Sequence, residues 1–110
     1  MDISELSVND LVARAISAAQ LAAKAHHDTN PHWFPCGFAW VNIRPARGKV
    51  VAHLKSIGIG RTDDYYGGYS IWNPSGHHSQ HMYTLEAGAR AFAEVLRAAG
   101  IKANVHTRLD

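Results

Sequence analysis

Histidine is the residue type that stands out when this sequence is searched for chemistry. The 110 residues include eight histidines. One set with the spacing of metal ligands is His27, His32 and Cys36, and a second consists of His77, His78 and His81. Structural zinc takes four tetrahedral ligands, and catalytic zinc commonly takes three plus water. Neither set has the paired short spacings of such sites, and an HEXXH motif is absent, so we predict no metal site and no cofactor.

The residues that could act as nucleophile or general acid have simpler structural explanations. Cys36 is the single cysteine, which excludes an internal disulfide framework, and a lone cysteine is usually a small buried residue. Asp63 and Asp64 are expected in a solvated turn. Glu86 lies in the first turn of a predicted helix, where the helix dipole favours a carboxylate. We therefore predict no catalytic residue and a binding protein rather than an enzyme.

A glycine- and tyrosine-rich loop and several aromatic residues are the better candidates for binding. The segment 58–68 includes Arg61, which can face an anion. It does not fit a dinucleotide-binding fingerprint, because that motif needs a strand before it and a helix after it. The predicted binding residues are Trp40, Arg61, Tyr65, Tyr66, Tyr69, Trp72, His78 and His81.

The elements that position these residues follow from the hydrophobic pattern. Apolar residues at helical spacing predict a helix from Val8 to about Lys24, capped by Ser7, and a short helix over 50–57. They also predict a third helix, with Thr84 as its N-cap and Gly100 as its C-terminal stop. Alternation predicts strands over 36–43, 68–73 and 101–107. The polar stretch 77–83 is expected to pair with 68–73 as a hairpin.

After the first helix, the predicted order is strand, helix, strand, strand, helix, strand. This order is typical of an α+β, ferredoxin-like β-α-β-β-α-β sheet with its helices packed on one face. We predict one domain over residues 1–110, with the N-terminal helix in 1–30 and the split β-α-β core in 36–107. Its core is expected to include Val41, Leu54, Phe92, Leu96 and Ile101.

The alternation also assigns side chains to the sheet face that the paired helices leave open. They are Phe38, Trp40, Asn42, Lys102, Asn104 and His106, with either Tyr69 and Ile71 or Trp72 from the third element. We expect the alanine-rich N-terminal helix to cover this face. The alternatives are a protein interface, such as a homodimer seam, and a platform for a ligand or nucleic acid.

Composition limits the class of protein. The hydrophobic fraction of 46% and the charged fraction of 18% are those of a globular chain, and no apolar run is long enough to span a membrane. The N-terminal residues do not resemble a secretory signal, and the single cysteine fits a reducing cytoplasm. A net charge of +2 does not by itself indicate nucleic-acid binding.

Three stretches, CGFAWVNI at 36–43, YGGYSIW at 66–72 and GIKANVHTRLD at 100–110, resemble a family of small, mostly uncharacterised proteins of tailed bacteriophages. The resemblance covers about residues 10–110 and includes no catalytic signature. It implies a viral protein in the bacterial host cytoplasm that inhibits host machinery, such as a CRISPR or other defence system. The expected partner is a host protein. The alternative is a small-ligand or nucleotide-handling protein, either a binding protein or an enzyme, that uses the Gly/Tyr loop and the histidines.

Overall fold

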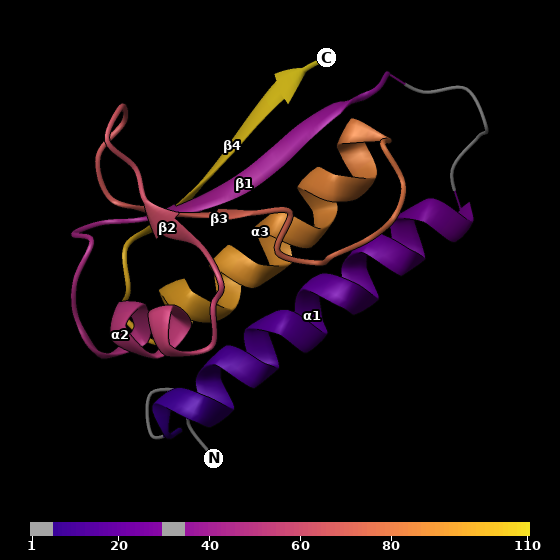
Figure 1. Ribbon diagram of the computed structural model, residues 1–110. Helices are drawn as coiled ribbons and strands as arrows, with labels where there is room; N and C mark the ends of the chain where they lie inside the picture. Colours follow the sequence, from indigo (N-terminus) through magenta and orange to yellow (C-terminus); the bar gives the residue numbers. More distant parts are fainter. Residues whose placement is uncertain (1–5, 30–34) are drawn as a thin grey trace.

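The computed structural model describes residues 6–29 and 35–110, which form a mixed α+β fold of three helices and a four-stranded antiparallel sheet (Figure 1). The helices are α1 (Val8–Thr29), α2 (Lys49–Ser56) and α3 (Met82–Ala98). The strands are β1 (Gly37–Ile43), β2 (Arg61–Thr62), β3 (Tyr69–Trp72) and β4 (Ala103–Leu109).

Helix α1 begins as the sequence predicts. The Ser7 hydroxyl accepts the Asp10 N–H at 3.1 Å, and the Ser7 carbonyl accepts the first helical bond from Leu11, which is the expected arrangement at an N-cap. The helix continues to Thr29, beyond the predicted end near Lys24. Its buried face is a stripe at helical spacing, made of Leu11, Val12, Ala15, Ala19 and Ala23.

The sheet has the strand order β2-β3-β1-β4, and every neighbouring pair is antiparallel. The central strand β1 sets the register, because Trp40 lies opposite Trp72 on β3 and opposite His106 on β4. Alternate β1 residues point to opposite faces. Ala39, Val41 and Ile43 are therefore buried in the core, as the alternation predicts.

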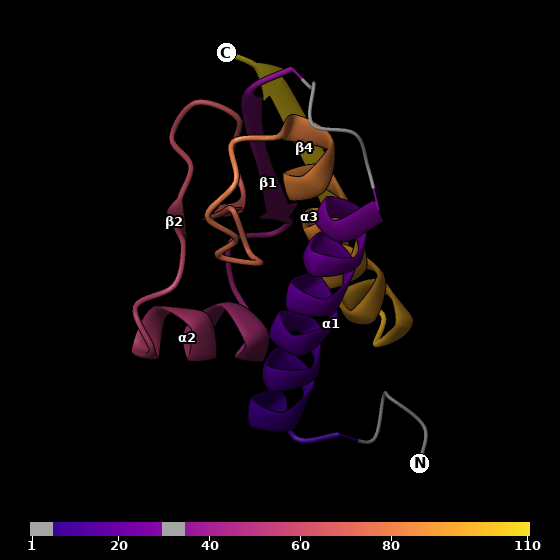
Figure 2. The ribbon, with the colours of Figure 1, turned by 90° about the vertical axis from the view of Figure 1, so that its right-hand side faces the viewer.

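All the long helices lie on one side of the sheet. Helix α3 packs against β1 and β4, and α1 packs against α3; Figures 1 and 2 show both helices on the same side of the sheet. The contact is close: a Cβ atom added to Gly88 of α3 would lie 3.2 Å from the Ala19 carbonyl oxygen of α1. The expectation that the first helix covers the other face is wrong, because its small side chains fit the small residues of α3 instead.

One contiguous core joins the sheet to the helices. Val41, Leu54, Phe92 and Leu96 are buried in it, and Ile101 is partly buried against it. The predicted core residues therefore lie together.

Two predictions about the chain between β3 and α3 are wrong. Residues 77–81 form no strand apart from an isolated bridge between Cys36 and His81. The strand that pairs with β3 in a hairpin is the two-residue β2, which precedes it. The N-cap of α3 is His81 rather than Thr84, since Thr84 is fully buried inside the helix, with its Oγ1 2.8 Å from His26 Nδ1.

None of the helices in residues 6–29 and 35–110 is both long and apolar enough to cross a membrane.

Candidate functional site

The face of the sheet opposite the helices carries a row of aromatic rings. Trp72, Trp40 and His106 lie side by side on β3, β1 and β4. The rings of Trp40 and Trp72 are 6.4 Å apart with an interplanar angle of 17°, and those of Trp40 and His106 are 5.7 Å apart at 27°. The register therefore produces three nearly parallel rings across three strands.

Two further rings extend this row at its ends. Tyr66, from the loop between β2 and β3, stacks on His106 at 6.0 Å and 15°. Phe38, two residues before Trp40 on the same strand face, lies 5.0 Å from the Trp72 ring. We call these five residues the aromatic platform: Phe38, Trp40, Tyr66, Trp72 and His106.

The platform is accessible. Trp72 is 60% exposed and Tyr66 is 52% exposed, whereas the remaining rings are partly buried by their neighbours. Exposed aromatic rings on a surface are unusual, because burying them is favourable. The arrangement therefore provides exposed aromatic surface for a bound group.

Cationic side chains flank the platform. The Arg108 guanidinium, opposite Phe38 on β4, lies 5.5 Å from the centre of the Phe38 ring, within cation–π distance. On the far side, Arg61 of β2 lies opposite Ser70, so it too belongs to the open face. Aromatic surface flanked by arginines can take a planar ring together with an anionic group.

The loop between β2 and β3 folds against the open face and places Tyr66. Asn42 of β1, 0% exposed, holds the loop: its amide donates to the Gly67 carbonyl at 2.9 Å and to the Ser70 hydroxyl at 3.1 Å. Its carbonyl oxygen accepts from Arg44 Nε at 3.0 Å, and the Arg44 guanidinium also donates to the Tyr66 carbonyl.

Glycine is required where this loop meets the sheet. Gly68 has φ +75°, and a Cβ there would lie 2.6 Å from the Asn42 side-chain oxygen. A larger residue at this position would push the loop away from Asn42.

Asp63 closes the loop from the other end. Its carboxylate accepts the backbone N–H groups of Tyr65 and Tyr66 at 2.9 and 2.8 Å and the Ser70 hydroxyl at 3.0 Å. These bonds hold the pKa of Asp63 below its usual range, and the bond from the Tyr66 N–H has the largest effect. The carboxylate is thus part of the loop structure, which explains the acidic residue in this loop without a catalytic role.

A groove of about 1050 Å³ runs along the platform and around the β3 edge of the sheet. Its lining brings together five of the predicted binding residues, namely Trp40, Arg61, Tyr65, Tyr66 and Trp72. Tyr65 is 87% exposed at the tip of the loop.

The remaining predicted binding residues lie elsewhere. Tyr69 is in the core, 1% exposed, and its hydroxyl donates to the Ile59 carbonyl. The alternation did not decide which residues of β3 face the open side, Tyr69 and Ile71 or Trp72. In the structure Trp72 faces it, whereas Tyr69 and Ile71 are buried. His81 is buried at the start of α3, and His78 lies beside a second, smaller groove of about 390 Å³.

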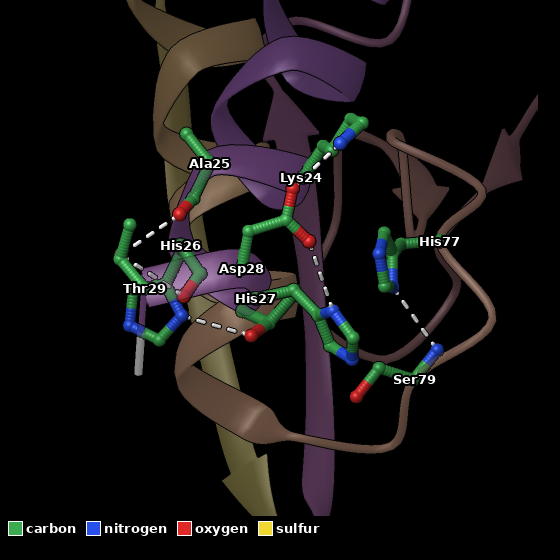
Figure 3. Close-up of polar contacts among 9 residues, drawn as sticks. Lys24, Ala25, His26, His27, Asp28, Thr29, His77 and Ser79 are labelled. Carbon is green, nitrogen blue, oxygen red and sulfur yellow. Dashed lines mark hydrogen bonds and ion pairs between the residues drawn. The ribbon is translucent and has the colours of Figure 1, made fainter. Parts of the chain in front are cut away.

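Those two histidines belong to a group beside the Phe38–Trp72 end of the platform. The end of α1 and the segment before α3 bring five imidazoles together, which we call the histidine cluster: His26, His27, His77, His78 and His81. Figure 3 shows three of them, His26, His27 and His77. Within residues 6–29 and 35–110, no three histidine, cysteine or carboxylate side chains are placed to share one metal ion. His32, of the first candidate metal set, lies outside the described residues.

Several residues of the platform were assigned to the open face by the alternation but not to the binding site. Phe38 lies two residues before Trp40 on β1, and His106 lies opposite Trp40 on β4, so both share its face of the sheet. Arg108 follows His106 by two residues and completes the same row. The period of two was therefore the signal that identifies them.

No protein family, curated protein or solved structure matches this chain.

Proposed function

We propose that the chain binds single-stranded nucleic acid, with bases stacked on the aromatic platform. The observation behind this proposal is the row of nearly parallel rings on three adjacent strands. Stacking on aromatic side chains contributes about 1–3 kcal/mol per base and tolerates any sequence, since every base has a flat π-face. RNA-recognition domains use aromatic residues on a four-stranded sheet in this manner.

The flanking cations support the same ligand. Arg108 and Arg61 lie on either side of the rings, where the phosphates of a strand lying across the sheet would pass. Phosphate contacts from arginine supply affinity without base specificity. A double helix would not expose its base faces to these rings, so the platform favours unpaired strands.

The fold of the sheet is part of the proposal. We infer a ferredoxin-like arrangement, in which α2 and α3 are the two connecting helices and α1 is an addition. The order β2-β3-β1-β4 with antiparallel neighbours supports this inference. It places β1 and β3, the strands with Trp40 and Trp72, at the centre of the sheet.

Fluorescence anisotropy with labelled single-stranded RNA, single-stranded DNA and the matching duplexes tests this function. We expect single strands to bind and Trp72→Ala to weaken binding about 5- to 150-fold, the equivalent of one lost base stack. Leu21→Ala is the control, because Leu21 is an exposed apolar residue on α1. Equal affinity of single strands and duplexes, or equal effects of the two substitutions, would contradict the proposal.

A second proposal is that the chain is a phage-type inhibitor acting on a host protein in the bacterial cytoplasm. The observation that favours it is Tyr65, which projects from the loop tip at 87% exposure, since exposed tyrosines are common anchors in protein interfaces. Expression of the chain in bacteria that carry an active CRISPR system tests it. Restored phage growth that Tyr65→Ala abolishes would support this function, and unchanged immunity would contradict it for that system.

A further inference from the structure

The histidine cluster brings together two parts of the chain that are about 50 residues apart. His26 and His27 lie in the last turn of α1, whereas the other three histidines belong to the segment 77–81 before α3. Figure 3 shows His77 of this segment facing the end of α1. Ring centres are 5.1 Å apart for His26 and His81, 4.9 Å for His27 and His77, and 4.6 Å for His77 and His78. Imidazoles at these distances repel one another when they are charged.

Two of these rings accept backbone hydrogen bonds that only an unprotonated nitrogen can accept. His81 Nδ1 accepts the Tyr83 N–H at 3.2 Å and caps α3. His77 Nδ1 accepts the Ser79 N–H at 3.1 Å. A histidinium has hydrogen on both ring nitrogens and accepts nothing. Protonation of either ring therefore breaks a bond that shapes the 77–81 segment.

One nearby carboxylate favours positive charge on the cluster, but for His77 its effect on the pKa is smaller than that of burial and of the neighbouring histidines. On α1, Asp28 lies 3.5 Å from His27 Nδ1 but is already paired with Lys24 at 2.5 Å. Tyr83 of α3 and Cys36 before β1 adjoin His81, and Asp110 after β4 lines the smaller groove. Burial, and then the neighbouring histidines, lower the pKa of both His77 and His81 below its ordinary value.

The same segment holds the Phe38–Trp72 end of the aromatic platform. The Gly37 N–H, next to Phe38, donates to the Gln80 carbonyl at 3.0 Å. Asn73, next to Trp72, donates from its side chain to the His77 carbonyl at 3.1 Å. The smaller groove is lined by residues of both regions, including Phe38, Trp72 and His77.

We propose that the histidine cluster is a proton-operated switch for the platform: protonation of its imidazoles loosens the 77–81 segment and displaces Phe38 and Trp72 from their binding positions. The inference rests on the proposed function, because it concerns regulation of that same surface. The ligand remains a single-stranded nucleic acid, which binds to the neutral form of the cluster.

The direction of the pH effect follows from linkage. Since His77 and His81 bind protons less readily in the folded chain than in the unfolded one, the unfolded chain takes up more protons as the pH falls below the ordinary histidine value of about 6.5. The stability that the neutral rings contribute is fully present above that pH. It is lost as the pH decreases toward the lowered pKa values.

Substitution by asparagine separates this switch from a merely structural role. An asparagine side-chain oxygen accepts a backbone N–H as Nδ1 does, and it does not titrate. The test compares wild type with His77→Asn/His81→Asn at about pH 7.5 and about pH 5.5, on either side of the ordinary pKa. His53→Asn on α2, outside the cluster, is the control.

Two measurements are made on each protein: amide hydrogen exchange with melting temperature, and oligonucleotide affinity. In wild type and His53→Asn, we expect the protection factors of the Ser79 and Tyr83 amides to fall about tenfold or more at the lower pH. In the double variant, we expect the protection factors not to fall at the lower pH. Its melting temperature should decrease between the two pH values by at least about 4 °C less than that of wild type. The oligonucleotide affinity of the double variant should equal that of wild type at the higher pH and exceed that of wild type at the lower pH.

The two proposals fail in different ways. An oligonucleotide that does not bind at the higher pH contradicts the platform, whereas hydrogen exchange still tests the cluster. Binding at the higher pH together with the same pH response in wild type and the double variant overturns the switch alone. The comparison is made between variants at one pH so that every other group of the chain is under the same conditions in both.

Discussion

Replacement of Asn42 by alanine tests whether the loop that carries Tyr66 is held by the sheet. Asn42 is fully buried and makes three hydrogen bonds, to Gly67, Ser70 and Arg44. Each bond contributes about 0.5–1.5 kcal/mol, and a buried partner left unsatisfied costs about 1–3 kcal/mol. Because the Gly67 and Arg44 groups are exposed and can turn to water, we expect a loss of about 2–4 kcal/mol in the free energy of unfolding.

Asn104→Ala is the matched control. Asn104 lies directly opposite Asn42 on β4, on the same face of the sheet, and it is exposed. Its replacement should change stability by no more than about 0.5 kcal/mol. Urea unfolding of the two variants, with equal m-values, gives the comparison. If Asn42→Ala is as stable as Asn104→Ala, the account of how the loop is held is wrong.

Three further predictions concern the core, the helix layer and assembly. Leu96→Ala should lower the free energy of unfolding by about 2–5 kcal/mol; an unchanged thermal midpoint would refute the placement of this fully buried residue. Ala19→Leu should cost about 1–3 kcal/mol by overpacking the contact between α1 and α3, whereas Ala13→Leu on the exposed side of α1 should be neutral; calorimetry that ranks them equally would contradict the packing of α1 on α3. The chain is expected to form a homodimer, and analytical ultracentrifugation that shows only the 12.0 kDa species at high concentration would argue against it.

The sequence was sufficient to predict the elements with a strong period. The alternation of 36–43 gave both faces of β1, with Val41 inward and Trp40 outward. The capping residue Ser7 and the terminating Gly100, which has φ +85° after α3, are local signals that depend on few neighbours. These predictions needed no knowledge of tertiary contacts.

The errors arose where tertiary contacts overrode local preference. Thr84 is a good N-cap by type, but its hydroxyl contacts His26 of α1, and the helix begins two residues earlier with His81 as the cap. The two-residue strand β2 has no hydrophobic pattern because Arg61 and Thr62 are both exposed. An alanine stripe also does not reveal its partner, so the sequence could not decide between α3 and the open face for α1.

The candidate site was predictable only in part for the same reason. The period of two assigns Trp40 and His106 to one face, but the positions of Tyr66 and of the Asp63-closed loop depend on hydrogen bonds that no pattern reports. The histidine cluster likewise requires the end of α1 to lie beside the segment 77–81.

The central claim is that bases stack on the open face, and an NMR titration with single-stranded RNA tests it most directly. The account predicts that the indole N–H signals of Trp40 and Trp72 and the ring signals of His106 shift upfield, since these rings form the row on β1, β3 and β4. Signals from the exposed side of α1, such as Leu21, should not move. Shifts confined to the helical side, or no shifts at saturating RNA, would contradict the account.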